Sequence, residues 1–225
     1  MTTRTALVAG ATGLVGGHVK ALLLASADYA RVTVLVRKPL GEAHAKLKEL
    51  VVDFEKLADH AADFAVDDVY ACLGTTIKVA GSQEKFRRVD HDYTVAVAEL
   101  AKKAGASRLA LVSSVGATGP TEKGGNFYLR VKGETEKDVR ALGYDTLSIA
   151  RPSLLVGDRK ESRPLEAAGI GVARALAFTM VGGLRGYRPI EAKTVAAGLV
   201  RATLDGAPGV RELAFAELTE LAARM

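Results

Sequence analysis

The sequence predicts an α/β fold, in which a single doubly wound, Rossmann-type domain has a parallel sheet with helices on both faces. Three observations lead to this prediction. Short apolar, β-branched runs alternate with longer segments of helical periodicity, a glycine-rich turn follows the first apolar run, and no repeat or low-complexity linker divides residues 1–225. Strands that are apolar along their whole length are typical of a parallel sheet covered on both sides.

The expected elements follow from these runs. Strands are predicted in TALVAG (5–10), RVTVLVR (31–37), LKELVVD (47–53), DDVYACLG (67–74), SRLALVSS (107–114) and DTLSIARPSLLV (145–156), and VRELAFAEL (210–218) predicts a last strand running into a short helix. Helices are predicted over 14–26, 88–105, 126–142 and 191–204. The Gly- and Arg-rich segment 157–190 has weaker periodicity, which predicts either a small substrate-binding lobe or a cluster of surface loops.

Composition excludes several classes of protein. Of the 225 residues, 48% are hydrophobic and 25% are charged, as in ordinary globular proteins. No apolar run reaches the length of a membrane span, and the N-terminus lacks a signal-peptide layout, so we expect no membrane partner. Cys72 is the only cysteine, which precludes an internal disulfide and fits a cytoplasmic location. The four histidines are scattered, so no metal site is predicted.

The charge balance bears on the partner. The net charge is +5 and the pI is about 9.3, but basic and acidic residues are interleaved along the chain, and only 5% of residues are aromatic. A basic surface of this kind is usually just solvated, and no nucleic-acid partner is predicted. The alternative interpretation of the positive charge is that the protein binds a small anionic ligand such as a nucleotide.

A glycine turn joins the first strand to its helix. VAGATGLVGG places Gly10, Gly13 and Gly16 between the two elements. Glycines let the backbone turn tightly and let a pyrophosphate approach the N–H groups at the start of a helix. The alternative is a tight turn without a ligand, but the strand–turn–helix context favours an NAD(P)-binding domain.

The end of the second strand bears on the choice of cofactor. Folds selective for NAD usually carry an acidic residue here, whereas this chain has Arg37 and Lys38. A guanidinium can pair with a 2′-phosphate, so NADP(H) is predicted over NAD(H). The alternative is that both are solvated charges. Asp53, after the third strand, either caps a helix or contacts the adenine side of the cofactor.

Further candidates follow the fourth and fifth strands. Gly74 and Thr75 form a small-residue turn, and Ser113 and Ser114 end the fifth strand. The carboxyl edge of an open parallel sheet is where ligands bind, so these residues are expected near the cofactor. The alternative is that their polar groups only satisfy the local backbone.

Tyr128 and Lys132 lie four residues apart near the start of the next helix, so their side chains share one face. A carbonyl reduced by hydride must also receive a proton, which a tyrosine beside a lysine cation can donate. A serine hydroxyl can orient the carbonyl; of the two we favour Ser114, while Ser113 touches the cofactor or closes the strand. Lys132 can also bond the nicotinamide ribose.

GATGLVGG, LGTT, LVSSVGA, YLRVK and ARPSLLVGDRKESRP together resemble the atypical, extended-like short-chain dehydrogenases/reductases, and CLGTT, RVDHDYTVAVAELAKKAG and DRKESRP are similar to the group of the oxidoreductase HIV Tat-interacting protein. The resemblance spans nearly the whole chain. It implies NADP(H) binding, a Ser114–Tyr128–Lys132 catalytic set and a homodimer paired through the helices after strands four and five. The cofactor contacts that it implies are Gly10, Thr12, Gly13, Leu14, Val15, Gly16, Arg37, Cys72, Leu73, Gly74, Pro152 and Ser153.

One departure from the family pattern is Ser153, which stands where glycine often follows the arginine–proline pair. Three functions remain open. An NADP(H)-dependent oxidoreductase acting on a small carbonyl, quinone or related molecule is favoured, because the Ser/Tyr/Lys set is intact. An NADP(H)-sensing regulatory or scaffold protein without turnover comes second, and a nucleotide-sugar epimerase or dehydratase comes last. The basic residues Arg159, Lys160, Arg163, Arg185 and Arg188 either attract an anionic substrate, pair with Glu161 and Glu166, or form an interface.

Overall fold

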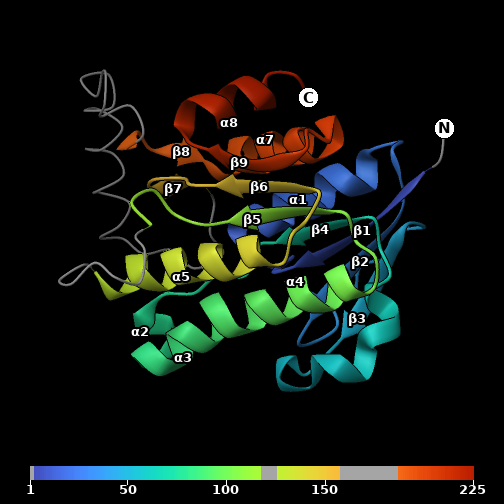
Figure 1. Cartoon of the computed structure of the whole chain (residues 1–225). Coiled ribbons are helices and arrows are strands. Elements are labelled where there is room, and N and C mark those ends of the chain that lie inside the picture. The colour runs from blue at the N-terminus through green and yellow to red at the C-terminus, as the bar shows by residue number, and fades with distance from the viewer. Residues whose placement is uncertain (1–2, 118–125, 158–186) are drawn as a thin grey trace.

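Seven parallel strands form one sheet in the computed structural model, which describes residues 3–117, 126–157 and 187–225 (Figure 1). The strand order is β3-β2-β1-β4-β5-β6-β9, and every neighbouring pair is parallel. These strands are β1 (Arg4–Ala9), β2 (Tyr29–Val36), β3 (Leu47–Val51), β4 (Asp68–Ala71), β5 (Arg108–Val112), β6 (Thr146–Ala150) and β9 (Gly209–Leu213). The predicted α/β fold class is confirmed.

The chain reverses its direction of travel across the sheet between β1 and β4. It moves outward from β1 to β3 and then returns to the other side of β1 with β4. Such a switch point leaves a crevice at the carboxyl ends of the two strands, where open α/β sheets bind ligands. The fold therefore directs attention to the loops after β1, β4 and β5.

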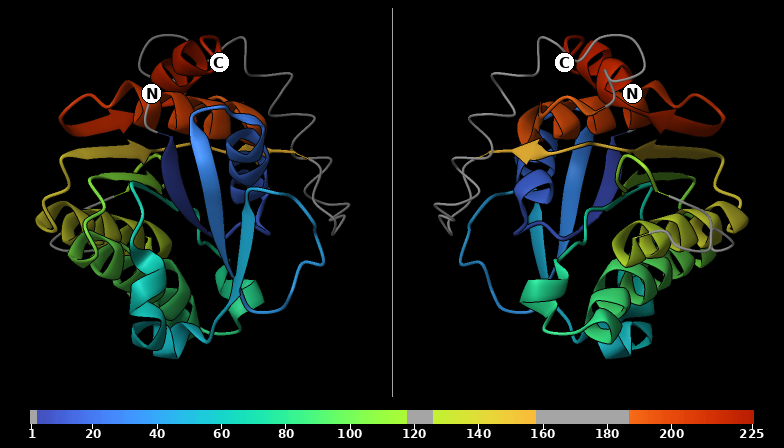
Figure 2. Two further views of the ribbon diagram at one scale, coloured as in Figure 1. Left: turned by 90° about the vertical axis from the view of Figure 1, so that its right-hand side faces the viewer. Right: turned by 90° about the vertical axis from the view of Figure 1, so that its left-hand side faces the viewer.

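Helices cover both faces of the sheet (Figure 2). One face carries α1 (Leu14–Ala25), α7 (Ala192–Asp205) and α8 (Phe215–Ala222); the other carries η1 (Phe54–Phe64), α4 (Tyr93–Lys103) and α5 (Phe127–Ala141). Short turns α2 (Ile77–Ala80), α3 (Gln83–Arg87) and η2 (Arg88–Asp92) connect β4 to α4. The doubly wound arrangement follows from right-handed crossovers between parallel strands.

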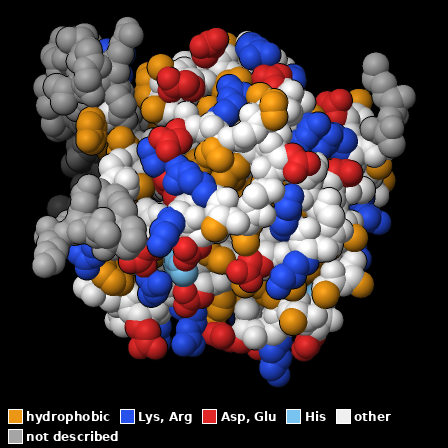
Figure 3. All heavy atoms as spheres, viewed as in Figure 1, with side chains coloured by type: hydrophobic (Ala, Val, Ile, Leu, Met, Phe, Trp, Pro, Cys, Tyr) orange, Lys and Arg blue, Asp and Glu red, His pale blue; other side chains and the backbone are white. Residues whose placement is uncertain are grey.

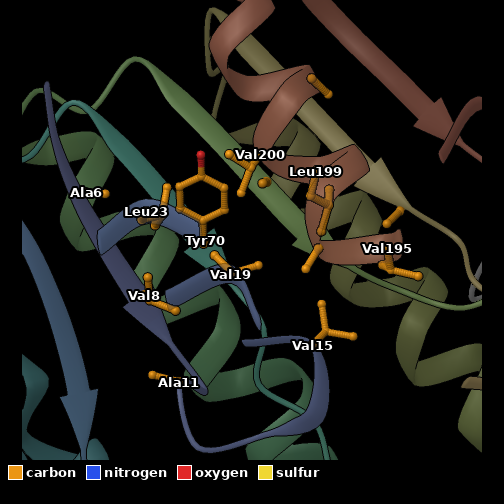
Figure 4. Packing of buried hydrophobic residues seen from close by; sticks show 14 of the residues in the cluster. Ala6, Val8, Ala11, Val15, Val19, Leu23, Tyr70, Val195, Leu199 and Val200 are labelled. Carbon is orange, nitrogen blue, oxygen red and sulfur yellow. The ribbon is translucent and has the colours of Figure 1, made fainter. Parts of the chain in front are cut away.

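The apolar face of each helix builds its part of the core. Val15 and Val19 of α1 pack with Val195 and Leu199 of α7 above the sheet, and Tyr70 of β4 points up between these helices (Figure 4). Full burial of a Val or Leu side chain stabilises a fold by about 1.5–3 kcal/mol. The helix after the glycine turn is thus held by a helix from the far end of the sequence.

Local signals set the ends of α5, which carries the tyrosine–lysine pair. The Asn126 side chain caps the helix by accepting a hydrogen bond from the N–H of Tyr128 at 2.9 Å. Gly143 follows the helix with a φ of +65°, a conformation that glycine adopts without steric cost. The observed boundaries, 127–141, lie within the predicted helix 126–142.

Two sequence predictions need correction. The predicted strand 145–156 is divided: β6 ends at Ala150, and Leu155–Val156 form β7, which pairs with β8 (Ile190–Glu191) in a separate two-stranded sheet. Pro152 lies in the break, and its missing N–H cannot join a ladder. The predicted helix 88–105 begins with the π-helical turn η2 before α4. Of the predicted lobe 157–190, residues 158–186 lie outside the described ranges.

Candidate active site

The glycine turn after β1 is packed tightly against β4. Gly10 has a φ of +87°, and a Cβ there would lie 2.4 Å from the carbonyl oxygen of Cys72. A Cβ on Gly16 would lie 2.2 Å from the carbonyl oxygen of Gly10, and one on Gly13 would lie 3.2 Å from the same oxygen. Packing alone therefore requires glycine at positions 10 and 16, as expected where a helix approaches a strand closely.

The first turn of α1 fits an anion. Its N-cap, Gly13, offers no side chain, and the turn contains no acidic residue. The backbone N–H groups of such a turn carry partial positive charge and bind phosphates. Leu14 and the exposed Thr12 flank this turn, whereas the side chain of Val15 is buried in the core, so Val15 can contact a ligand only through its backbone. These residues fit the dinucleotide that the sequence predicts.

Two cations lie where the 2′-phosphate is expected. Arg37 and Lys38 are exposed directly after β2, and no ion pair joins either of them to another described residue. Asp53 is the N-cap of η1, where its carboxylate accepts the N–H of Glu55 at 3.0 Å. The capping alternative for Asp53 is thus the contact observed, and its contact with the cofactor stays a prediction.

The turn after β4 lies beside the glycine turn. Cys72 and Leu73 follow the last residue of β4, and desolvation raises the pKa of the Cys72 thiol to about 12. Gly74 is exposed, and the N–H of Thr75 donates a hydrogen bond of 2.9 Å to Oδ2 of Asp90. The turn after β4 therefore contacts both η2 and the glycine turn after β1.

The two serines after β5 have different surroundings. Ser113 is buried, and its hydroxyl donates to Oε1 of Glu136 at 2.5 Å. Ser114 is partly exposed, and within the described residues its hydroxyl donates one hydrogen bond, to the carbonyl of Val115 at 3.3 Å. A Cβ on Gly116 would lie 3.5 Å from Leu129, so this loop passes beside the start of α5. Of the two serines, Ser114 is thus the more exposed, and its contact with a substrate stays a prediction.

Tyr128 and Lys132 do share one face of α5. Nζ of Lys132 lies 5.9 Å from the centroid of the Tyr128 ring. The ring of buried Phe86 also lies near it, with 5.5 Å between the ring centroids and an angle of 40° between the ring planes. Tyr128 is partly exposed, while Lys132 is buried. A tyrosine beside a lysine is a pair that can transfer a proton to a carbonyl, and this role of Tyr128 and Lys132 stays a prediction.

Sequence reasoning missed two buried acids that hold this arrangement. Asp90 pairs with Lys132, with 2.7 Å between Oδ1 and Nζ. Glu136 accepts two hydrogen bonds from Arg151, at 3.0 and 2.5 Å, in addition to that from Ser113. Glu136 follows Lys132 by four residues, so the helical spacing that linked Tyr128 to Lys132 also pointed to it. Asp90 had no comparable signal.

The turn after β6 also lies at the carboxyl edge of the sheet. Pro152 is buried and accepts the N–H of Val115 at 2.9 Å, and the hydroxyl of Ser153 donates to the carbonyl oxygen of Arg188. Arg188 stacks on Phe215, and the other four basic residues predicted around the pocket lie outside the described ranges. Ser153 therefore ties β6 to the segment before β8.

Within the described residues, one open surface cavity of about 370 Å³ lies against α8 and another of about 440 Å³ lies between α1 and α7, both away from this edge. Across the described ranges, no helix combines the length and hydropathy needed to span a bilayer. Among those same residues, no three metal-type ligands gather into a cluster. The carboxyl edge of the sheet remains the place where the candidate residues converge.

Comparison with known proteins agrees with this geometry. A family model described as NAD(P)H-binding matches residues 10–175. Rat Protein HTATIP2 is 42% identical over 171 residues, covering 74% of this chain and 69% of the relative. Protein fmp52, mitochondrial, from Aspergillus clavatus is 36% identical over 208 residues, covering 89% and 87%.

A solved structure shares the fold. MoeE5 in complex with UDP-glucose and NAD superimposes with a TM-score of 0.69 at 17% identity, covering 98% of this chain and 81% of the other. At that identity the likeness concerns the fold alone. The family model and the relatives show that the chain belongs to a family of NAD(P)H-binding proteins, and its fold is of the Rossmann type.

Proposed function

We propose that the protein is an NADP(H)-dependent oxidoreductase that transfers hydride to or from a small carbonyl, quinone or related compound. One observation carries the proposal: the ammonium group of Lys132 lies 5.9 Å from the ring of a partly exposed Tyr128, at the edge of the sheet where the glycine turn lies. Membership of an NAD(P)H-binding family supports the cofactor class.

The side chains divide the chemistry as follows. Tyr128 donates the proton to the substrate oxygen during reduction and takes it back during oxidation. Lys132 stabilises the phenolate that Tyr128 becomes, and Ser114 hydrogen-bonds the substrate oxygen as negative charge develops there. The bound NADP(H) supplies or accepts the hydride. Phe86 supports the Tyr128 ring from the side.

The cofactor would lie along the carboxyl edge. The uncapped start of α1 holds its pyrophosphate, with Gly10, Thr12, Gly13, Leu14, Val15 and Gly16 around it. The cations after β2 select NADP(H) over NAD(H), because a 2′-phosphate gives Arg37 a bidentate partner. The remaining proposed contacts are Lys38, Asp53, Cys72, Leu73, Gly74, Thr75, Ser113, Lys132, Pro152 and Ser153.

The broader setting also belongs to the proposal. Residues 1–225 act as one domain, in which 157–190 help to bind a small-molecule substrate. The location is cytoplasmic, although the Aspergillus clavatus relative, Protein fmp52, mitochondrial, is by its name a protein of mitochondria. A homodimer would pair through α4 and α5, on the face where Figure 3 shows acidic and basic side chains interspersed.

The experiment is NADPH consumption against a panel of aldehydes, ketones and quinones, with the wild type and Tyr128→Phe side by side. Turnover that falls by about 10²-fold or more in the variant would identify Tyr128 as the proton donor. NADPH binding with no turnover by either protein would favour a cofactor-sensing regulator instead. Retained NAD(H) together with a UDP-sugar would favour the epimerase, whose chemistry uses the same tyrosine and lysine.

A further inference from the structure

Glu49 lies at the outer edge of the sheet, beneath the loop that carries the two cations proposed to bind the 2′-phosphate. It belongs to β3, which among the described strands has β2 as its only neighbour. Leu47 packs with the core on the α1 side of the sheet, and side chains alternate along a strand, so Glu49 projects to that same side. Its carboxylate there meets the backbone that follows β2.

The carboxylate of Glu49 holds two backbone N–H groups. Oε2 accepts the N–H of Leu40 at 2.9 Å, and Oε1 accepts that of Glu42 at 3.3 Å. Gly41, between them, has a φ of +70°, a conformation that glycine adopts without steric cost. Within the described ranges Glu49 forms no ion pair, so its charge is directed at this backbone. Hydrogen bonds to a carboxylate are stronger than those between neutral groups.

Two further contacts hold the same loop against α1. The side chain of Leu40 packs against the core on the α1 side, and the carboxylate of Glu42 pairs with Lys20 of α1. The Glu42 side chain is 48% exposed, so water screens this ion pair and it contributes little by itself. The two hydrogen bonds to Glu49 are therefore the stronger polar anchor of residues 37–42.

The two cations lie between two fixed points of the backbone. Upstream, β2 ends at Val36, whose carbonyl oxygen accepts the N–H of the residue after β3 at 2.9 Å. Downstream, Glu49 holds the backbone of Leu40, so only residues 37–39 bridge the gap. The ring of Pro39 fixes its own φ and restricts the lysine before it to extended conformations. Because the bridge is short and stiff, the anchor at Leu40 restricts the directions in which both cations can point.

We propose that Glu49 is a positioning residue for cofactor selection, whose carboxylate fixes the loop after β2 so that Arg37 and Lys38 face the 2′-phosphate of NADP(H). The inference deepens the proposed function and rests on it, since it concerns the same cofactor and the same two cations. Glu49 touches neither substrate nor cofactor, and it acts through the backbone of Leu40 and Glu42.

The negative charge of Glu49 by itself has the opposite effect on NADPH binding. A carboxylate repels a nearby phosphate, and an acidic residue near the end of the second strand is typical of folds that select NAD. If Glu49 acted only through its charge, its removal would tighten NADPH binding. If it acts as an anchor, its removal weakens NADPH binding, so the sign of the change separates the two roles.

The test is the ratio of the dissociation constants of NADPH and NADH, measured by calorimetry on the full chain. Glu49→Ala removes both hydrogen bonds, so NADPH binding should weaken by roughly 5- to 10-fold while NADH binding stays unchanged. Glu49→Gln keeps one acceptor oxygen and should recover part of the loss. Tighter NADPH binding in either variant, or a ratio equal to that of the wild type, would overturn the inference.

Glu42→Ala is the matched control. It removes the same charge from the same loop but leaves the backbone N–H of residue 42 and its hydrogen bond to Glu49 in place. The ratio should stay near that of the wild type, because a half-exposed ion pair contributes little. A loss of NADPH preference as large as that in Glu49→Ala would mean that Glu49 has no particular role.

A double variant tests whether Glu49 acts through Arg37. Without the guanidinium there is less for the loop to position, so Glu49→Ala should change the ratio less in the Arg37→Ala background than in the wild type. Fully additive effects would count against the inference. Hydrogen exchange without cofactor tests the anchor itself: the amides of Leu40 and Glu42 should exchange faster in Glu49→Ala, and unchanged exchange would contradict the anchor.

Failure of the proposed function has a different signature. A wild type that binds NADPH no more tightly than NADH would refute the NADP(H) assignment, and with it the inference, whatever the variants do. A wild type that prefers NADPH, with the same preference in Glu49→Ala, would leave the assignment intact and overturn only the role of Glu49. Thermal unfolding shows that each variant is folded, and Glu49→Gln serves if Glu49→Ala is not.

Discussion

Ser113 donates its hydroxyl proton to Glu136 across 2.5 Å, inside the protein, and so joins the carboxyl end of β5 to α5. The same carboxylate receives two hydrogen bonds from Arg151, which follows β6. Arg140 adds a further ion pair at 3.1 Å. Because Ser114 is the next residue along the chain, this network fixes the serine proposed to bind substrate relative to Tyr128, which lies two turns earlier on the helix.

Replacement of Glu136 by glutamine should destabilise the fold. The variant leaves Arg151 without its buried anionic partner, and hydrogen bonds between charged groups contribute more than neutral ones, so we expect a loss of about 2 kcal/mol. Since Arg151 is 27% exposed, water recovers part of its solvation and the loss stays below that of a fully buried pair. Urea unfolding measures the change, with exposed Glu220→Gln as the control; equal stability of the two variants would contradict the assignment.

The same network makes stability depend on pH in the acid range. Burial by itself would raise the pKa of Glu136, but the hydrogen bonds from Arg151 and Ser113 outweigh it, and the pKa is lowered. A carboxyl whose folded pKa is depressed contributes stability above its ordinary value, and this contribution is lost as the pH falls through the folded pKa. The stability gap between the wild type and Glu136→Gln should therefore begin to narrow as the pH falls below the ordinary pKa of a glutamate, about 4.3, and close further as the lowered pKa is passed. A gap that stays constant there would show that Glu136 is not an ionised partner.

The glycine turn offers a matched pair of substitutions. A Cβ on Gly16 would lie 2.2 Å from the carbonyl oxygen of Gly10, whereas one on Gly17 meets its nearest neighbour at 3.6 Å. Gly16→Ala should lose about 2–3 kcal/mol of stability through overpacking and should weaken NADPH binding. Gly17→Ala should gain up to about 1 kcal/mol, because alanine favours a helix interior. Thermal unfolding and NADPH titration measure both, and similar behaviour of the two variants would argue against the close approach.

The cofactor preference depends on Arg37. Arg37→Ala should weaken NADPH binding by roughly 10- to 100-fold and leave NADH binding unchanged, because only NADPH carries the 2′-phosphate. Arg31→Ala is the control, since Arg31 is also exposed but lies near the opposite end of β2. Dissociation constants that stay the same for both cofactors in Arg37→Ala would refute the NADP(H) assignment.

Cys72 should be a slow nucleophile despite its place at the site. Desolvation raises the pKa of its thiol to about 12, so very little thiolate is present at neutral pH. Alkylation by iodoacetamide near pH 8 should be at least about 10²-fold slower in the folded protein than in urea. Comparable rates in the two states would mean that the thiol is solvated.

Much of the architecture could be predicted from the sequence, because strong periodicity and a glycine turn define long elements. The helix that carries Tyr128 and Lys132 was located to within a residue at each end. The predicted strand runs through Pro152, although a proline inside an apolar run argues against a continuous central strand. What the sequence does not show is the partner strand β8, which lies more than thirty residues further along the chain and makes Leu155–Val156 a separate strand.

Some residues of the candidate site could likewise be predicted from the sequence, and others could not. Residues that directly follow strands could be placed at one edge of the sheet from the topology. Asp90 instead lies in the π-helical turn η2, and the periodicity of the sequence does not predict such a turn. The sequence is compatible with two roles for Ser113, contact with the cofactor and closure of its strand. Its hydroxyl is engaged by Glu136, and contact with the cofactor stays a prediction.

The packing of α1 against α7 has a consequence for biosynthesis. Val15 and Val19, which immediately follow the glycine turn, share a core with Val195 and Leu199 (Figure 4). On a translating ribosome the first helix emerges long before its partner is made, and its apolar face stays uncovered for most of synthesis. The first helix therefore acquires its final packing, and with it the glycine turn its final support, only when α7 and α8 have been made and complete the layer above the sheet.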